Sequence, residues 1–323
     1  MNHKTVVAAL VALLFFIAPA RNGAAKDINF GWPSGTGWTT LPFKVAADKG
    51  FFEKEGLKVR MITFRGTNLM LAALLSGDLD YMTLLPFTAG VAARGAPVKI
   101  VASITKSSAA AIIAKPEIDS IKALKGKKVG INSFGSSMDY SAYIALSRSG
   151  LDPNKDVALL TAGGGNADRL AALMSGAIDA TVVSSPFEFI AEKQGFKTLM
   201  SMRQLGELVR IPITGVAVAQ KKIDKEPDEI IRLLRALRSS ILVLQQQRDY
   251  GIALFEKALR LERPSAEKFY DLFRDEFNPE LTLPDAVVND LLAVGTFRSK
   301  EQEKTLYNAA AVRDWTLAEK AKR

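Results

Sequence analysis

One stretch of this chain occurs twice. Residues 66–80 read Gly-Thr-Asn-Leu-Met-Leu-Ala-Ala-Leu-Leu-Ser-Gly-Asp-Leu-Asp, and residues 165–179 read Gly-Asn-Ala-Asp-Arg-Leu-Ala-Ala-Leu-Met-Ser-Gly-Ala-Ile-Asp. Each copy leads through an apolar run to a Pro-Phe pair, with one inserted residue in the second copy. A spacing of about a hundred residues is too long for a solenoid, whose repeats span roughly 20–50 residues. The repeat therefore predicts two similar lobes.

Each copy predicts a short helix followed by a buried strand. Thr67 and Asn166 are residue types that cap helix N-termini, and Gly77 and Gly176 stand where a helix would end. The apolar helical stripes are Leu71, Leu74 and Leu75 in one copy and Leu170, Leu173 and Met174 in the other. These apolar side chains are most simply interpreted as core packing, so any function lies at the ends of the unit.

The rest of the chain also alternates strands and helices, which predicts an α/β protein. A strand, a loop, a helix over residues 41–50 and a second strand form a βαβ unit near the N-terminus. From Pro227 onward the pattern is helical, which predicts a C-terminal helical layer. The strands predicted outside the repeat are 28–32, 57–64, 98–104, 107–114, 128–132, 157–161, 196–202 and 211–220.

The N-terminus has the pattern of a secretory signal peptide. Lys4 precedes an apolar stretch over residues 6–17, and small residues follow up to Ala25. We therefore expect residues 1–25 to be a cleavable leader, cut after Ala20 or Ala25, and the protein to be exported. An uncleaved anchor is the alternative.

Missing residue types exclude several kinds of chemistry. The chain has no cysteine, and its one histidine is His3, inside the expected leader. Thiolate catalysis, a Ser-His-Asp triad and the usual zinc sites are therefore excluded, and no metal or cofactor is expected. The formal net charge is +9, or +7 without Lys4 and Arg21, which favours anionic solutes. No basic stripe interleaved with aromatic residues is present, so we expect no nucleic-acid binding.

Loops rich in Gly, Ser and Thr mark the expected ligand face. In an open α/β sheet, ligands bind beyond the carboxyl ends of the strands, where loops lead into helix N-termini that attract anions. Four loops fit this description: 34–40, 65–67, 135–137 and 163–166. A single such loop is usually only a helix cap, but two per lobe predict a shared cleft. Neither a Walker A motif nor a dinucleotide fingerprint is present.

Three further segments resemble a known family. They are Ala46-Ala47-Asp48-Lys49-Gly50-Phe51-Phe52-Glu53-Lys54-Glu55-Gly56-Leu57-Lys58-Val59, Leu75-Ser76-Gly77-Asp78-Leu79-Asp80, and Leu124-Lys125-Gly126-Lys127-Lys128-Val129-Gly130. They are similar to the periplasmic solute-binding proteins of nitrate/sulfonate/taurine-type ABC importers. The resemblance covers nearly the whole mature chain.

The resemblance implies a periplasmic-binding-protein-like fold of type II, with two α/β lobes joined by a two-strand hinge. Lobe I would comprise residues 26–104 and 211–323, lobe II residues 105–210, and the hinge residues 103–106 and 208–213. The implied partners are a small-molecule ligand and an ABC permease, and the protein would be a monomer without enzymatic activity. With the loops above, the expected ligand-binding residues are Ser34, Gly35, Thr36, Trp38, Arg65, Gly66, Thr67, Thr83, Pro86, Ser136, Ser137, Gly164, Asn166, Ser184 and Pro186.

The ligand itself stays open at this point. A small organic anion such as a sulfonate, nitrate or a carboxylate is expected, although Arg65 is the only obvious cation among the predicted residues. Aromatic residues near the loops, including Trp32, Phe87 and Phe134, would suit a larger solute. The alternatives are a ligand-sensing periplasmic module and a binding protein for thiamine-pyrimidine precursors. Related enzymes with this fold use cysteine or histidine, which the mature chain lacks.

Overall fold

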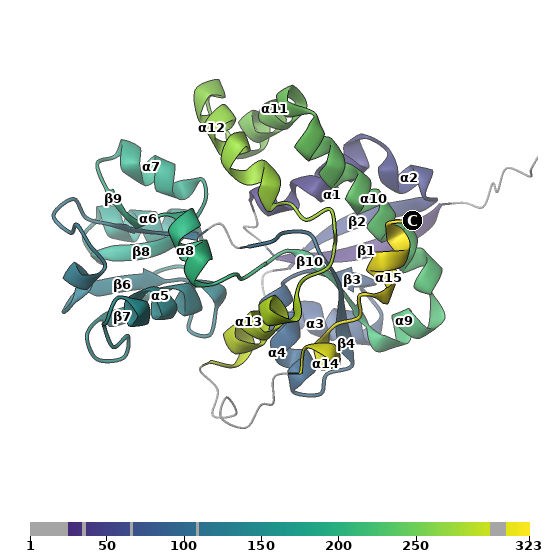
Figure 1. The fold of residues 1–323 in the computed structure, drawn as a ribbon, viewed down its shortest axis with the longest axis horizontal. Coiled ribbons are helices and arrows are strands. Elements are labelled where there is room, and N and C mark those ends of the chain that lie inside the picture. Colours follow the sequence, from purple (N-terminus) through teal and green to yellow (C-terminus); the bar gives the residue numbers. More distant parts are fainter. Residues whose placement is uncertain (1–24, 34–36, 65–66, 108–109, 298–307) are drawn as a thin grey trace, which may run out of the picture.

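The computed structural model describes residues 25–33, 37–64, 67–107, 110–297 and 308–323, and these form two five-stranded sheets. Figure 1 shows the two sheets side by side, each with its own helices. We call the sheet β2-β1-β3-β10-β4 with its helices lobe I, and the sheet β7-β6-β8-β5-β9 with its helices lobe II. The predicted two-lobed α/β fold is confirmed.

The strands of lobe I are β1 (Lys26–Pro33), β2 (Leu57–Phe64), β3 (Tyr81–Met82), β4 (Val98–Ser103) and β10 (Gly215–Ala219). Those of lobe II are β5 (Ala110–Ala114), β6 (Lys128–Ile131), β7 (Ala158–Thr161), β8 (Ala180–Ser184) and β9 (Lys197–Met200).

The helices up to the second link between the lobes are η1 (Trp38–Thr40), α1 (Leu41–Asp48), α2 (Phe51–Lys54), α3 (Thr67–Ser76), α4 (Leu85–Ala93), η2 (Lys122–Leu124), α5 (Ser137–Arg148), α6 (Asn166–Met174), α7 (Phe187–Lys193) and α8 (Met202–Leu208). The C-terminal helices are α9 (Gln220–Lys225), α10 (Pro227–Gln246), α11 (Arg248–Leu259), α12 (Arg263–Phe273), η3 (Arg274–Glu276), α13 (Asp285–Thr296), α14 (Ala309–Val312) and α15 (Thr316–Ala321).

Strand directions make the carboxyl edges of the two sheets face each other. In lobe I, β10 is antiparallel to both β3 and β4, so β1, β2, β3 and β4 all end at one edge, from which the chain crosses to β5. In lobe II, β8 is antiparallel to β5, so β6, β7 and β8 end at the edge where β5 begins. The loops that follow these strands therefore point toward the other lobe.

Two backbone segments link the sheets: residues 104–107 leave lobe I, and residues 209–214 return to it. They are paired where they leave lobe I, because Gly215 lies opposite Ser103 and the Ile104 N–H donates to the Thr214 carbonyl oxygen at 2.9 Å. A C-terminal segment contacts the first of these links, because the Asn278 N–H donates to the Ile104 carbonyl oxygen at 2.8 Å. The Asn278 side chain also donates to the Ser103 carbonyl oxygen at 3.1 Å. This third segment was not predicted, because such long-range hydrogen bonds leave no local sequence pattern.

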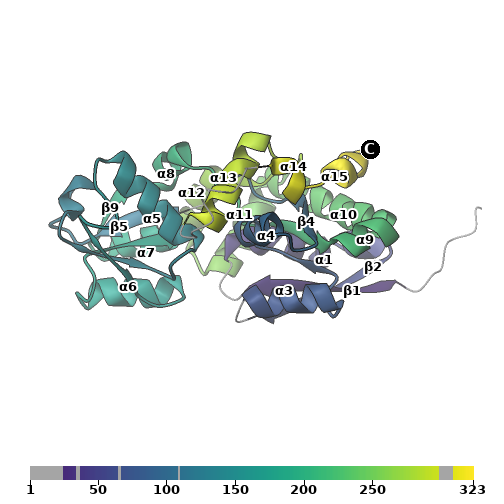
Figure 2. The same cartoon turned by 90° about the horizontal axis from the view of Figure 1, so that it is seen from below.

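The sequence repeat is also a structural repeat. The Asp80 carboxylate accepts from the Asn29 N–H at 2.8 Å, and the Asp179 carboxylate accepts from the Lys128 N–H at 2.9 Å. A Cβ atom on Gly31 would lie 2.5 Å from Leu79 Cδ1, and one on Gly130 would lie 2.5 Å from Ile178 Cδ1. Equivalent glycines therefore leave room for the apolar side chain that stands between the helix and the strand of each copy. Figure 2 shows the two repeat helices, α3 and α6, on the same side of the molecule.

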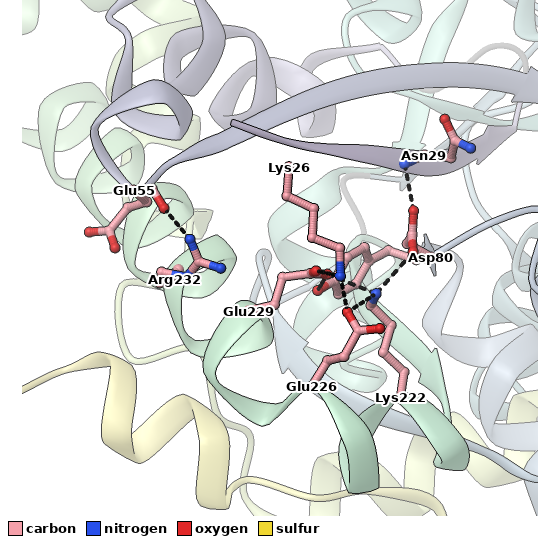
Figure 3. Close-up of polar contacts among 9 residues, drawn as sticks. Lys26, Asn29, Glu55, Asp80, Lys222, Glu226, Glu229 and Arg232 are labelled. Carbon is pink, nitrogen blue, oxygen red and sulfur yellow. Dashed lines mark hydrogen bonds and ion pairs between the residues drawn. The ribbon is translucent and has the colours of Figure 1, made fainter. Parts of the chain in front are cut away.

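The first strand of lobe I is attached to the C-terminal helices by a charge cluster, which we call the β1–α10 cluster: Lys26, Asp80, Lys222, Glu226 and Glu229 (Figure 3). Lys222 and Glu229 are buried, and their charged atoms lie 2.8 Å apart. The Tyr81 hydroxyl also donates to Glu229 at 2.7 Å. The cluster lies at the amino-terminal end of β1, away from the edge that faces lobe II.

Several predicted boundaries were wrong. The strand expected over 107–114 begins at Ala110, and the strand expected over 211–220 is confined to Gly215–Ala219. Helix α8 was missed, since the preceding strand was extended to Met202. Ser201 and Gln204 form a capping box that marks the true helix start. The lobe boundaries at residues 104/105 and 210/211 stay a prediction.

Candidate ligand-binding site

Part of the predicted site lies outside the described residues: Ser34, Gly35, Thr36, Arg65 and Gly66. In lobe I, Thr67 is half-buried and is the first residue of α3, which follows β2 at the edge facing lobe II. Thr67 therefore has a position suitable for contact with a ligand.

The other predicted lobe I residues are packed inside the protein. Trp38 is 2% exposed, and its ring lies 4.7 Å from that of Phe273 and 5.3 Å from that of Phe277. The Thr83 hydroxyl accepts from the Gly215 N–H at 3.1 Å, which ties β3 to β10. Pro86 is buried in the first turn of α4. The geometry gives these three side chains a packing role, and their contact with a ligand stays a prediction.

In lobe II, Ser136 and Ser137 lie at the start of α5. The Ser136 hydroxyl accepts from the Asp139 N–H at 3.2 Å and donates to the Ser133 carbonyl oxygen at 2.7 Å, so Ser136 is the N-cap of this helix. Ser137 follows it and is half-buried. The Ser137 hydroxyl therefore lies close to the carboxyl edge of the lobe II sheet.

The Arg169 side chain, which the sequence analysis did not select, holds Gly164 and Asn166 together, and Asn166 in turn contacts Ser184. The Asn166 amide donates to the Ser184 hydroxyl at 2.6 Å and accepts from the Ser184 N–H at 3.0 Å. Arg169 donates to Asn166 Oδ1 at 2.6 Å and to the Gly164 carbonyl oxygen at 3.3 Å. The predicted cap was displaced by one residue, because Gly165 is the N-cap and Asn166 begins α6. Arg169 could have been noticed as a charge at a repeat position where the first copy has Met70.

Pro186 is buried at the end of β8, and next to it lies a second group that the sequence analysis missed. The Ser185 hydroxyl donates to one carboxylate oxygen of Glu188, which is 5% exposed. Its other oxygen, Oε2, is buried and has no hydrogen-bond partner among the described residues. Burial raises the pKa of Glu188 to about 7, although the Ser185 hydrogen bond opposes this shift. No periodic pattern in the sequence marks this residue.

Two cavities lie between elements of the two lobes. One of about 340 Å³ is lined by Phe189, Glu192 and Lys193 of α7 and by Ser265 and Lys268 of α12. The other, of about 780 Å³, is lined by residues of the links, of α8 and of the C-terminal segment, among them Lys106, Arg203, Arg210 and Asn278. The predicted ligand-binding residues line neither cavity.

The sequence matches the family described as NMT1/THI5 like over residues 39–249. The chain belongs to this NMT1/THI5-like family. A putative aliphatic sulfonates-binding protein of Bacillus subtilis (strain 168) is 27% identical over 275 residues, covering 80% of this chain and 79% of that protein. A putative binding protein of Brucella abortus (strain 2308) is 30% identical over 158 residues, covering 47% of this chain. That match spans only 46% of the Brucella protein.

The fold is also that of a solved binding protein. The periplasmic aliphatic sulphonate binding protein SsuA from Escherichia coli superposes with a TM-score of 0.67 at 22% identity, covering 87% of this chain and 97% of SsuA. The periplasmic-binding-protein fold of the NMT1/THI5-like chain is therefore confirmed, as is its resemblance to sulfonate-type binding proteins.

The described residues contain no group of three or more His, Cys, Asp or Glu side chains arranged to hold a metal ion. Within the same ranges, no helix combines the length and the apolar character needed to cross a membrane.

Proposed function

We propose that this protein is an extracytoplasmic receptor that binds a small organic anion between its two lobes and delivers it to an ABC permease. The observation that carries the proposal is the topology, which turns the carboxyl edges of both sheets toward each other. Ligands of open α/β sheets bind at such edges, beside helix N-termini that favour negative charge. Membership of the NMT1/THI5-like family and the named sulfonate-binding relatives support the same class of solute.

Ligand capture in such a receptor is a hinge motion about the two links. A ligand favours the closed form only through contacts that it makes better there than in the open form. The receptor needs no reaction chemistry, which agrees with a sequence whose only histidine is His3 and which has no cysteine.

A thermal-shift screen tests the proposal. The exported protein is stripped of bound solute by reversible denaturation and then melted with butanesulfonate, taurine, nitrate, benzoate and an aminopyrimidine. A ligand present at a hundred times its Kd stabilises the folded state by about 2.7 kcal/mol, so the melting temperature rises clearly. If the aminopyrimidine alone raises it, the alternative ligand class is correct. If no compound does so, or if a bound compound is chemically converted, the proposal fails.

Site variants then locate the binding. We expect Thr67→Val and Ser137→Ala to weaken the binding of whichever compound scores, because each removes a hydroxyl at a facing edge. Ser147→Ala is the matched control, since Ser147 is exposed near the other end of the same helix α5. Unchanged affinity in both site variants would place the ligand elsewhere.

A further inference from the structure

Arg169 is a buried cation in lobe II, and its hydrogen bonds to described residues all go to neutral groups. It is 2% exposed. Its Nε donates to the Val182 carbonyl oxygen at 3.0 Å, and Nη1 donates to the carbonyl oxygens of Gly163 and Gly164 at 3.4 and 3.3 Å. Its Nη2 donates to Asn166 Oδ1 at 2.6 Å. One guanidinium thus joins the end of β8, the loop after β7 and the start of α6.

No acidic side chain of the described ranges forms an ion pair with Arg169. Its neighbour Asp168 is exposed, and the Asp168 carboxylate accepts from the Gly165 N–H at 3.0 Å. Burial lowers the pKa of the Arg169 guanidinium to about 10, and Asp168 offsets this only in part, so the group is charged at neutral pH. A buried charge without a counter-charge is unfavourable, and an anion nearby would reduce that cost.

The internal repeat shows that packing does not require an arginine here. The equivalent residue of lobe I is Met70, which is fully buried against the equivalent strands. The same helix-on-sheet unit therefore folds with an uncharged, unbranched side chain at this position. The charge is an additional feature of lobe II, and its contacts with Gly163 and Gly164 place it beside the loop after β7, at the edge that faces lobe I.

We propose that Arg169 is a positioning residue that makes the lobe II face selective for an anionic group of the ligand. It acts in two ways: it holds the Asn166 amide and the loop carbonyls in fixed orientations, and it places a positive charge directly behind Asn166 and Ser184. In a partly buried setting, such a charge acts on a nearby anion far more strongly than it would in bulk water. This inference rests on the proposed function and deepens it by naming the charge that selects the ligand.

The electrostatic effect of Arg169 can be measured without a ligand, through the pKa of a single introduced thiol. Because the chain has no cysteine, Ser184→Cys introduces a single thiol one amide away from the guanidinium. We expect the pKa of this thiol, read from the pH dependence of its reaction with iodoacetamide, to be about one unit lower than in Ser184→Cys/Arg169→Met. Arg169→Lys, which keeps the charge, should restore most of the difference. The thiol of a Ser147→Cys control should not respond to Arg169→Met.

A binding measurement separates charge selection from a merely structural role. Calorimetric titrations compare butanesulfonate with the neutral butyl methyl sulfone for the wild-type, Arg169→Met and Arg169→Lys proteins. We expect Arg169→Met to weaken sulfonate binding about tenfold or more and to leave any sulfone binding unchanged, with partial recovery in Arg169→Lys. Met70 supports the expectation that Arg169→Met folds, and the melting temperature checks it.

Failure of this inference can be distinguished from failure of the proposed function. If the wild-type protein binds the sulfonate, and Arg169→Met binds it equally well with an unchanged thiol pKa, Arg169 has no selective role and the receptor function stands. If the wild-type protein binds no anion in the screen, the proposed function fails. An unshifted thiol pKa would then overturn the role of Arg169 as well.

Discussion

At the scale of single residues, Glu188 shows how burial changes the chemistry of an ordinary side chain. Its carboxyl group is buried next to Ser185 and has one oxygen without a partner in the described part of the chain. Burial raises its pKa to about 7, Glu192 contributes to the rise, and Lys268 of α12 opposes it. The folded protein therefore binds a proton at Glu188 that the unfolded chain releases at a pH near 4.5.

Glu188 should make the protein less stable as the pH rises. Between about pH 4.5 and 7 the folded state holds more protons than the unfolded state, so the free energy of unfolding falls, by up to roughly 3 kcal/mol. Glu188→Gln cannot titrate and should remove this decline. The measurement is urea unfolding of both proteins at pH 5 and pH 8. Glu117→Gln, which changes an exposed residue after β5 that does not contribute to the shift of Glu188, is the control and should keep the wild-type dependence. A wild-type pH dependence in Glu188→Gln would show that Glu188 does not titrate in this range.

Residue identities alone predicted which loops lie at the facing edges better than they predicted which side chains are buried there. Loops after strands were correctly expected at the facing edges, because Gly, Ser and Asn mark strand ends and helix starts. Trp38 was expected at the ligand, but it packs against Phe273 and Phe277 from a distant part of the chain. Arg169 was overlooked because a charge within an apolar stripe is usually exposed, and only the fold shows that it is buried.

At the scale of elements, the repeated unit determines the centre of each sheet. The pairings Phe30 with Tyr81 and Val129 with Ala180 are equivalent, so the strand of each copy lies beside β1 or β6 and not beside β2 or β7, which directly precede the repeat helices. This part of the fold could be predicted because it depends on local patterns of apolar residues. Helix α8 was harder to predict because it is short and follows a strand directly.

The β1–α10 cluster joins elements that are far apart in the sequence. Burial lowers the pKa of Lys222, but hydrogen bonds to Glu229 and Asp80 outweigh that effect, and the pKa is raised overall. The Lys26 hydrogen bond is the largest of the causes that lower the pKa of Glu226 to about 2. The ionised Glu226 therefore stabilises the folded state above about pH 4.5, and this stabilisation is lost as the pH falls toward 2.

Removing the buried lysine of this cluster should destabilise lobe I. Lys222→Met leaves the buried Glu229 with a single partly exposed cation, Lys26, and breaking a buried ion pair typically costs about 3–5 kcal/mol. We expect a loss of about 3 kcal/mol in urea unfolding and acid unfolding at a higher pH. Lys225→Met, in the same helix α9 but exposed, should stay within about 0.5 kcal/mol of the wild-type protein. Equal stability of the two variants would show that the cluster contributes little.

At the scale of the whole molecule, the lobes touch away from their links. Helix α7 of lobe II lies against α12 of lobe I: the rings of Phe189 and Phe269 are 6.4 Å apart, and Lys268 Nζ lies 5.1 Å from the Phe189 ring centroid. Figure 1 shows these two helices at the top of their respective lobes. The sequence could not predict this contact, because its two sides come from different lobes and neither has a periodic pattern that identifies a partner.

This contact should favour the closed arrangement of the lobes. Phe189→Ala removes the aromatic contact across the lobes, and edge-to-face ring pairs contribute about 0.5–1.5 kcal/mol beyond their buried area. A shift of that size changes the ratio of closed to open molecules severalfold, because 1.4 kcal/mol corresponds to a factor of ten. We expect small-angle scattering of the ligand-free variant to give a larger radius of gyration. Ligand affinity should fall by a similar factor, since binding must then also drive closure.

The control for this prediction is another phenylalanine of lobe II. Phe196 packs within the lobe II core, so Phe196→Ala should lower thermal stability without changing the radius of gyration. If Phe189→Ala leaves both the radius and the affinity unchanged, contact between α7 and α12 does not influence closure, and the links alone set the balance between open and closed forms. If instead affinity falls while the radius stays constant, Phe189 acts on the ligand or its immediate surroundings rather than on the position of the lobes.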